Sequence, residues 1–282
     1  MKILLTGASG YIGQYIKKVL KDRSLAFVEG NRNSFDYENI DSIREFYADK
    51  SISHVIHLAG SVSNRDCAEL FNINIRGLYN LLAVSSEYQI QHVTFVSGNN
   101  VYGQYKDSEY NETDICQPEF DNIYGLSKYT GELIVRDYCT NKKIGFAIVR
   151  VADVFGPDQK HGNLMKTIIK NLKQNQPLVL YGEGKRVRDY IHVNDVSEGL
   201  LYIATNHLLG TYNLGTGTGT SVKQILGIAS GIYNDKVTIQ HNDIENEDTS
   251  SVILSPVKLA KAGFVARYTI EHGMKEILGE DI

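Results

Sequence analysis

A tyrosine and a lysine four residues apart, Tyr124 and Lys128, stand at the start of a helical pattern over residues 124–139. At this spacing both side chains lie on one face of the helix. A free phenol, with a pKa of about 10, is a poor acid or base at neutral pH, but a neighbouring ammonium, together with the positive ring of a bound nicotinamide, favours the phenolate. We therefore expect a lowered pKa for Tyr124 and proton exchange with a hydroxyl or carbonyl group during hydride transfer. The alternative is an exposed helix turn without a catalytic role.

A glycine-rich turn near the amino terminus points to the hydride carrier. Gly7, Gly10 and Gly13 follow a β-rich run and precede a helical pattern. The first glycine of such a turn permits a tight bend, the second lets the backbone approach a pyrophosphate, and the third lets helix and strand pack closely. The amide groups at the start of the helix, where Tyr11 and Ile12 lie, attract phosphate. The pattern predicts a dinucleotide site, and an ordinary glycine-rich turn is the alternative.

The end of the second β-rich run bears on which dinucleotide binds. Dinucleotide folds usually place an acidic residue there, where it binds the ribose hydroxyls. This chain has Asn31 and Arg32 instead. Arg32 can pair with a 2′-phosphate, and no carboxylate stands beside it in sequence to repel one. This favours NADP(H), with NAD(H) as the alternative if Arg32 is a solvated turn residue and Asn31 holds the ribose.

The elements that must position these residues alternate along the first half of the chain. β-rich runs cover residues 3–6, 25–29, 54–58, 92–97 and 144–149. Helical patterns cover residues 11–22, 40–48, 67–88 and 124–139. Strands that alternate with helices predict βαβ units and a parallel sheet with helices on both faces. We expect an α/β fold with a Rossmann-type doubly wound parallel sheet.

The second half of the chain has a different texture. Beyond residue 150 the segments are shorter and richer in glycine loops, although two further β-rich runs occur before residue 215. We expect a dinucleotide-binding Rossmann domain over residues 1–150, with residues 187–215 returning to it. Residues 151–186 and 216–282 are expected to form a smaller C-terminal α/β substrate lobe.

Composition argues against several other classes of protein. The 282-residue chain has a net charge of −4 and no long basic run, which argues against nucleic-acid binding. It has no uninterrupted apolar stretch of about 18 residues, so we expect no membrane span. Its three cysteines are scattered and odd in number, which favours reduced thiols in a cytoplasmic protein. The histidines are dispersed, so we expect no metal site.

Further motifs follow in order along the chain. They are Val55–Gly60 (VIHLAG), Asn72–Asn74 (NIN), Val101–Gly103 (VYG), Arg150–Pro157 (RVADVFGP) and Gly184–Val193 (GKRVRDYIHV). With the glycine turn and the Tyr124/Lys128 pair, they make the chain resemble the extended short-chain dehydrogenase/reductase family over nearly its whole length. The resemblance is to the nucleotide-sugar epimerases, dehydratases and 4-keto reductases of that family. It implies an NAD(P)-dependent enzyme that acts on a nucleotide-diphosphate sugar, and a homodimer.

The resemblance also implies residue roles. Beyond the residues already named, the cofactor site would include Asp36, Tyr37, Leu58, Ala59, Gly60, Asn74, Ser97 and Val151. The substrate site would include Ser61, Val62, Asn99, Asp153, Asn163 and Arg188. Arg188 would contact the substrate diphosphate, because a guanidinium fork suits bidentate phosphate binding. Alternatively, Arg188 forms a surface ion pair with Asp189 or Asp195.

The chain departs from the family pattern in three respects. Gly98 stands where the family has a catalytic serine or threonine, so we expect Asn99, or a bound water, to supply the hydrogen bond to the substrate oxygen. The family's dehydratases carry an acidic pair where this chain has Asn99 and Asn100, which argues against a 4,6-dehydratase because amides do no acid–base work. Asp153 stands where the family has an asparagine that faces the phosphates. Its charge would repel a diphosphate unless a cation pairs with it.

Three functions follow from these residues. The first is a reductase, in which NADPH reduces a 4-keto-6-deoxy nucleotide sugar with Tyr124 as the acid; we favour it because the second strand ends without an acidic residue. The second is a nucleotide-sugar 4-epimerase, in which tightly held NAD oxidises C4 and the hydride returns to the other face of the sugar. The third is a cofactor-sensing regulator that performs no chemistry, which the loss of the hydroxyl at Gly98 leaves open.

Overall fold

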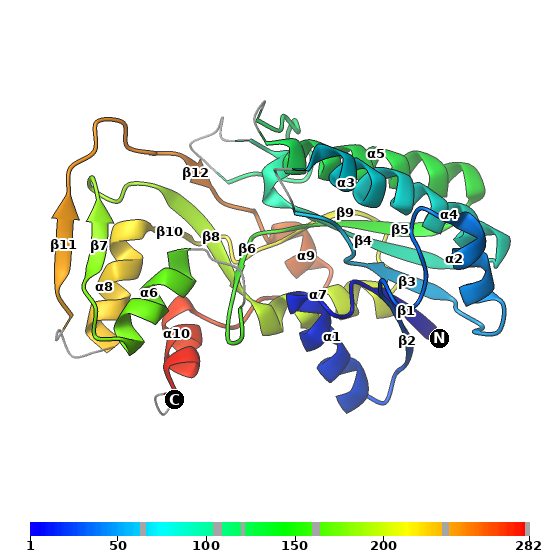
Figure 1. Ribbon diagram of the computed structural model, residues 1–282, viewed down its shortest axis with the longest axis horizontal. Coiled ribbons are helices and arrows are strands. Elements are labelled where there is room, and N and C mark those ends of the chain that lie inside the picture. Colours follow the sequence, from blue (N-terminus) through cyan, green and yellow to red (C-terminus); the bar gives the residue numbers. More distant parts are fainter. Residues whose placement is uncertain (63–65, 104–108, 120–121, 160–163, 233–236, 280–282) are drawn as a thin grey trace. The chain divides into compact units, whose positions relative to one another are not determined.

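The computed structural model describes residues 1–282 apart from 63–65, 104–108, 120–121, 160–163, 233–236 and 280–282. It divides the chain into two compact units (Figure 1). The first unit contains residues 1–103, 112–151 and 197–213, and the second contains residues 104–111, 152–196 and 214–282.

A six-stranded sheet forms the centre of the first unit, in the order β2-β1-β3-β4-β5-β9. Its strands are β1 (Lys2–Thr6), β2 (Ala26–Gly30), β3 (His54–His57), β4 (His92–Gly98), β5 (Gly145–Val151) and β9 (Gly210–Leu214). The neighbouring pairs from β2 to β5 are parallel. Parallel sheets are covered on both faces, which explains why β1, β3 and β4 are almost wholly buried. The predicted α/β fold with a doubly wound parallel sheet is confirmed.

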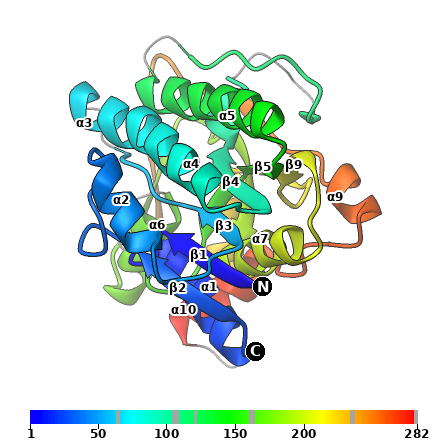
Figure 2. The ribbon, with the colours of Figure 1, turned by 90° about the vertical axis from the view of Figure 1, so that its right-hand side faces the viewer.

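Helices cover both faces of this sheet (Figure 2). One face carries α2 (Ile40–Tyr47), α3 (Cys67–Phe71), the π-helical turn η1 (Asn72–Gly77), α4 (Leu78–Glu87) and α5 (Ile123–Lys142). The other face carries α1 (Tyr11–Asp22) and α7 (Val193–Thr205). Ile43, Leu81 and Val135, from α2, α4 and α5, pack with strand residues such as Phe95 in one apolar core. The pattern over 67–88 predicts a single helix, whereas the structure interrupts it with the π-helical turn.

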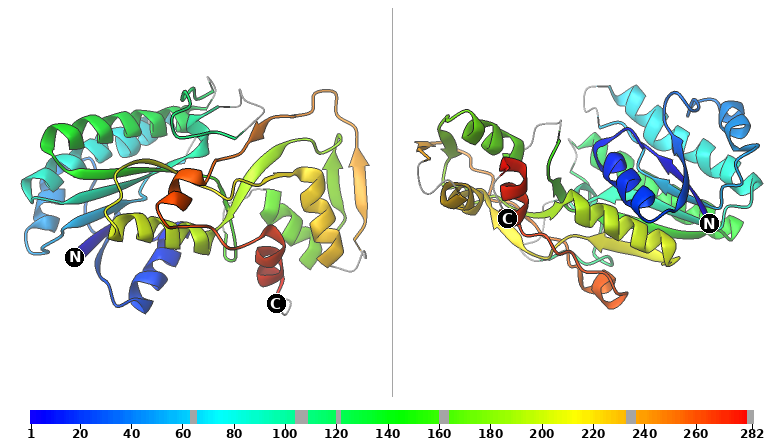
Figure 3. Two further views of the ribbon diagram at one scale, coloured as in Figure 1. Left: turned by 180° about the vertical axis from the view of Figure 1, so that it is seen from behind. Right: turned by 90° about the horizontal axis from the view of Figure 1, so that it is seen from below.

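The second unit is built around β8 (Val187–His192). This strand pairs with β6 (Asp153–Phe155), β10 (Gly219–Ser221) and β12 (Ser251–Val252). A separate pair joins β7 (Leu178–Tyr181) to β11 (Ile239–Asn242). The helices of this unit are α6 (Leu164–Lys173), α8 (Val222–Ile232), α9 (Val257–Lys261) and α10 (Ile270–Leu278). α6, α8 and α10 lie together and enclose a second apolar core (Figure 3).

The structure divides the chain differently from the prediction over residues 187–196. These residues were expected to return to the first domain, but they belong to the second unit, and only residues 197–213 join the first. The reason is strand pairing, because β8 bonds to β6, β10 and β12 and not to the six-stranded sheet. A buried strand has the same apolar pattern in either sheet, so its partners cannot be identified from the strand alone.

His57, at the end of β3, is fully enclosed, and its Nδ1 lies 2.8 Å from the Thr6 hydroxyl. Burial, with a smaller contribution from the charge of Lys128, lowers the pKa of His57 to about 3. A histidine in the unfolded chain protonates at about pH 6.5, so the unfolded state binds more protons between these two values. We expect the free energy of unfolding to fall as the pH drops through this window, by up to about 1.4 kcal/mol per pH unit from this group.

Urea unfolding between about pH 7 and pH 5 measures this dependence. The matched control is His57→Gln, which cannot protonate but retains a polar group that can bond to Thr6. That variant should lose part of the pH dependence of the parent protein. Identical pH dependence in the two proteins would show that His57 does not contribute it.

Candidate active site

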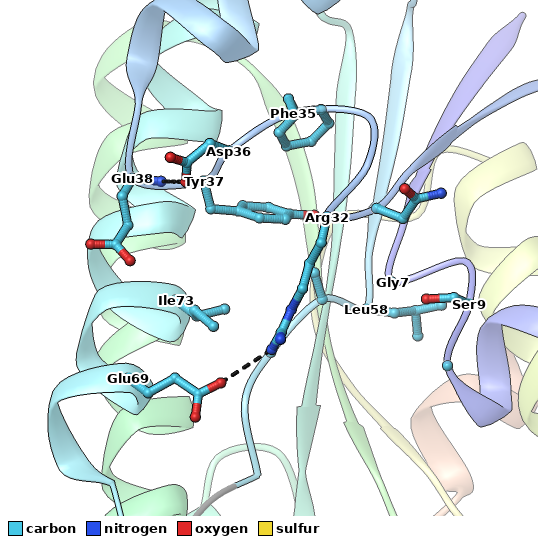
Figure 4. A pocket seen from close by; sticks show the side chains of 14 residues that line it. Gly7, Ser9, Arg32, Phe35, Asp36, Tyr37, Glu38, Leu58, Glu69 and Ile73 are labelled. Atoms are coloured by element: carbon cyan, nitrogen blue, oxygen red, sulfur yellow. Dashed lines mark hydrogen bonds and ion pairs between the residues drawn. The ribbon is translucent and has the colours of Figure 1, made fainter.

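A pocket lies beside β1, at the point where the order of the strands in the sheet reverses direction. β2 and β3 lie on opposite sides of β1, and ligands of such sheets bind outside the carboxyl ends of the strands at this point. A pocket of about 510 Å³ lies there. It is lined by the turn after β1, the loop after β2, the segment after β3, and side chains of α3 and η1 (Figure 4).

The glycine turn has the close approaches that a pyrophosphate cradle needs. Gly7 has φ +67°, and a Cβ there would lie 2.8 Å from the Ala59 nitrogen. A Cβ on Gly13 would collide with the Gly7 carbonyl oxygen. Gly10 is the N-cap of α1 and supplies no side-chain hydrogen bond to the helix, so the first amide groups of α1 have no side-chain cap. The turn therefore fits a dinucleotide, whose phosphates would bond to these amides.

Nine of the residues expected to bind the cofactor line this pocket. Those lining it are Gly7, Gly10, Asn31, Arg32, Asp36, Tyr37, Leu58, Ala59 and Gly60. Tyr11 and Ile12 begin α1, Ser97 lies near the end of β4, and Val151 ends β5. Five further residues line the pocket although the sequence does not predict them: Ser9, Phe35, Glu38, Glu69 and Ile73. Ser9, Phe35 and Glu38 are neighbours of predicted residues, but Glu69 and Ile73 come from α3 and η1, and no local pattern pointed to them.

Arg32 is not available to a ligand in the way that the sequence suggests. Its Nη2 donates a hydrogen bond to Glu69 Oε1 at 3.1 Å, across the pocket (Figure 4). The expectation of NADP assumed that Arg32 faces no carboxylate. That assumption fails because α3, which is distant in sequence, brings Glu69 to it.

Asn74 positions the backbone at the edge of the pocket. Its Oδ1 accepts a hydrogen bond from the Ser61 nitrogen at 2.7 Å, and its Nδ2 donates to the Ser61 carbonyl at 2.9 Å and to Ser127 Oγ at 3.0 Å. The residue is buried in the π-helical turn η1, a distortion that is frequent at functional sites. Asn74 therefore joins the segment after β3 to helix α5, which carries the tyrosine and the lysine.

Tyr124 and Lys128 lie in the first turns of α5, where the Asn122 side chain caps the helix by accepting from the Gly125 nitrogen at 2.8 Å. Lys128 Nζ donates to the Val96 carbonyl at 2.9 Å and lies 5.9 Å from the centre of the Tyr124 ring. A Cβ on Gly60, which lines the pocket, would lie 3.5 Å from Lys128 Nζ. The structure thus places the ammonium near both the tyrosine ring and this pocket.

Burial dominates the protonation of this pair. It lowers the pKa of Lys128 to about 8 and raises the pKa of Tyr124 to about 12. The sequence predicts that Lys128 and the positive ring of the cofactor together lower the Tyr124 pKa, whereas in the protein alone burial outweighs Lys128 and raises this pKa. The sequence shows that the two residues are neighbours, but it does not show how far the phenol is removed from water, which disfavours its charged form.

The Asn100 side chain lies beside Gly98, the position at which the chain lacks a hydroxyl. Asn99 is buried in the short 3₁₀ turn Asn99–Val101, whereas Asn100 is exposed. A Cβ on Gly98 would lie 3.2 Å from Asn100 Oδ1, so the Asn100 amide occupies the space beside Gly98. A Cβ on Gly125, the residue after Tyr124, would lie 3.2 Å from the Asn100 Cβ. The turn ends the alternation of a strand at this point, so Asn100 as well as Asn99 can lie near Gly98.

A buried ion pair fixes α5 to the sheet. Arg150, on β5, donates from Nη2 to Glu132 Oε2 at 2.7 Å, and both side chains are almost fully enclosed. Arg150 Nη1 also donates to the Tyr102 hydroxyl at 2.9 Å, which in turn donates to Asn213 Oδ1 at 2.8 Å. Both buried charges therefore have hydrogen-bonded partners, as burial of a charge requires. The network links the helix that carries Tyr124 to strands β5 and β9.

The second unit carries its own charged pocket, of about 310 Å³. Asp153, Arg186, Arg188 and Tyr190 line it. Arg188 is held by the Ser250 carbonyl at 3.0 Å and Ser250 Oγ at 2.9 Å, and lies 3.8 Å from Asp248. Two guanidinium groups line this pocket with the single lining carboxylate of Asp153, and Asp248 offsets part of the Arg188 charge. Guanidinium groups of this kind can bind phosphate.

The other residues that were predicted to bind the substrate differ in where the structure places them. The backbone of Ser61 bonds to Asn74, and Val62 is exposed. Asn163 lies outside the described residues. The alternative partners of Arg188 are used elsewhere, because Asp189 accepts from Thr216 and Asp195 accepts from the backbone of residues 267–268.

Two features are absent from the part of the chain that the structure describes. Its acidic, histidine and cysteine residues form no group that could hold a metal ion. None of its helices is both long and apolar enough to cross a lipid bilayer.

Comparison with known proteins gives a consistent family. A UDP-glucose 4-epimerase of Mycoplasma genitalium is 26% identical over 99% of this chain and 95% of its own length. A dTDP-D-glucose 4,6-dehydratase of Homo sapiens is 25% identical over 79% of this chain and 71% of its own length. The crystal structure of a Thermus thermophilus UDP-glucose 4-epimerase in complex with NAD has the same fold, with a TM-score of 0.87, 24% identity, and coverage of 99% of this chain and 98% of that one. Because the family model described as NAD dependent epimerase/dehydratase family matches residues 3–215, the chain belongs to that family.

Proposed function

We propose that this protein is a 4-epimerase of a UDP-hexose that uses tightly held NAD. The observation that carries the proposal is the Tyr124/Lys128 pair, placed by α5 beside a glycine-cradled pocket that fits a dinucleotide. The sequence alone favours a reductase of a 4-keto-6-deoxy sugar. The relatives support the epimerase alternative instead, because a UDP-glucose 4-epimerase matches almost the whole chain.

Particular residues weigh against the other activities. A 4,6-dehydratase is also among the relatives, but this chain has the amides of Asn99 and Asn100 where the resemblance calls for two acids. A regulator without chemistry would not need a buried lysine beside a tyrosine, and both are retained. The pocket of the second unit, with Arg186 and Arg188, supports a substrate that carries a diphosphate.

In the proposed reaction the protein moves one proton. When bound, NAD supplies a hydride acceptor and donor at its nicotinamide ring. The Tyr124 phenolate would take the proton of the sugar O4 as hydride leaves C4, and return it when hydride comes back to the opposite face. The Lys128 ammonium and the positive charge of an oxidised nicotinamide both favour the phenolate. They oppose the burial that raises the Tyr124 pKa to about 12.

Asn100 would hold the sugar oxygen in place of the missing hydroxyl. We expect Asn100→Ala to lower kcat about tenfold or more, because the substrate oxygen loses one hydrogen bond. Gly98 has φ −143°, which any residue adopts, so Gly98→Ser in the Asn100→Ala background should restore part of the rate. Steady-state kinetics of the three proteins measures this. Full activity of Asn100→Ala would remove the role assigned to Asn100.

The proposed activity is tested with two substrates. Purified protein is incubated with UDP-glucose without added cofactor, and UDP-galactose is followed by NMR. In a second arm the protein receives NADPH and dTDP-4-keto-6-deoxyglucose, and the absorbance of the reduced nicotinamide is followed. Formation of the epimer is the expected result. Consumption of NADPH without epimer would overturn the proposal in favour of the reductase, and silence in both arms would count against both enzymes.

A further inference from the structure

An ion pair lies across the dinucleotide pocket, and the proposed activity does not account for it. Arg32, after β2, reaches over the pocket to Glu69 of α3 (Figure 4). The Glu69 backbone is fixed in turn, because its nitrogen donates to Asp66 Oδ1, the N-cap of α3, at 2.9 Å. The carboxylate is therefore held at the pocket by the fold of α3, and both partners of the pair line the pocket wall.

The charges around this pocket are unfavourable for a further phosphate. Arg32 is the one cation among the described residues that line it, whereas Asp36, Glu38 and Glu69 contribute three carboxylates. The Asp36 carboxylate accepts a hydrogen bond from the Glu38 nitrogen at 2.9 Å. The side chains of Asp36 and Glu38 do not point toward the Arg32 guanidinium (Figure 4). Glu69 is thus the acid that decides whether the Arg32 charge is free.

We propose that Glu69 makes this pocket select NAD(H) over NADP(H) by pairing with Arg32. An exposed ion pair is weak, and Arg32 is 79% exposed, so a 2′-phosphate could draw the guanidinium away. The Glu69 carboxylate would then face the phosphate without a counter-charge and repel it. NAD(H) has only ribose hydroxyls at this place, so it binds without breaking the pair. This inference rests on the dinucleotide site and the NAD of the proposed function, and it adds the residue that sets the preference for NAD(H).

Calorimetric titration with NADH and NADPH, on protein first freed of bound NAD, tests the proposal without any sugar or turnover. The parent protein should bind NADH at least about tenfold more tightly than NADPH. Glu69→Gln removes the charge but keeps the size of the side chain, and it should narrow that preference about tenfold by strengthening NADPH binding. Adding Arg32→Gln to this variant should remove the gain, because the freed guanidinium is what binds the 2′-phosphate.

Glu38→Gln is the matched control, because it removes a carboxylate from the same pocket wall without freeing Arg32. Glu38→Gln should change the ratio of the NADH and NADPH dissociation constants by less than about threefold. The proposal is overturned if the parent protein prefers NADPH, if Glu69→Gln leaves the ratio unchanged, or if Glu38→Gln changes it equally. Absence of binding of either dinucleotide would overturn the proposed function as well, whereas binding with an unchanged ratio overturns this inference alone.

Discussion

Tyr124→Phe is expected to lower kcat by about 10³-fold while the protein still binds NADH. The change deletes the hydroxyl that exchanges the proton with the sugar O4, and acid–base groups of this kind contribute about 10²- to 10⁴-fold to the rate. The ring keeps its shape, and Tyr124 is not among the described residues that line the pocket, so the dinucleotide should bind as before. The measurement is kcat with UDP-glucose together with the dissociation constant of NADH.

Tyr129→Phe serves as the control for this prediction. Tyr129 lies on the same helix, one residue beyond Lys128, and removing its hydroxyl tests whether α5 tolerates the loss of a phenol. Its kcat should stay within about threefold of the parent value. An equal loss of activity in the two variants, or an unchanged rate in Tyr124→Phe, would contradict the role of Tyr124.

Glu132→Gln is expected to destabilise the protein by about 3–5 kcal/mol, which is the range for breaking a buried ion pair by removing one partner. The substitution leaves the buried guanidinium of Arg150, on β5, without a counter-charge. Because Glu132 follows Lys128 by one helical turn, the loss should also loosen the part of α5 that positions the catalytic pair. The measurement is the free energy of unfolding in urea.

Two controls separate the buried charge from a general effect of the substitution. Glu132→Leu combined with Arg150→Met removes both charges, and this double variant should be less destabilised than Glu132→Gln. Glu29→Gln breaks a more exposed pair with Lys17, and its loss of stability should be much smaller. If Glu132→Gln lowered the free energy of unfolding no more than Glu29→Gln, the buried Arg150–Glu132 pair would not hold α5 as described.

Much of the first unit can be predicted from the sequence because its signals are local. The helix at Tyr11–Asp22 and the strands flanking it follow from apolar periodicity and from three glycines at fixed spacing. The same spacing rule places Tyr124 and Lys128 on one face of α5. Each of these signals lies within a few residues of the feature that it predicts, so tertiary contacts do not have to be known.

The features that the sequence did not reveal depend on contacts between distant segments. Glu69 meets Arg32 only because α3 and the loop after β2 border the same pocket. β8 joins the second unit because its partners β6, β10 and β12 lie there. The raised pKa of Tyr124 reflects the enclosure of its phenol, which depends on packing around α5. Distances and burial of this kind are properties of the folded chain and have no pattern in the sequence.

The most direct test of the account follows one atom, the hydrogen on C4 of the sugar. UDP-glucose deuterated at C4 is incubated with the protein in ordinary water, and the product is examined by deuterium and proton NMR. The account predicts UDP-galactose that retains deuterium at C4, because the hydride leaves and returns within one enzyme. Loss of the label to water, its appearance at C6, or the absence of any epimer would contradict it.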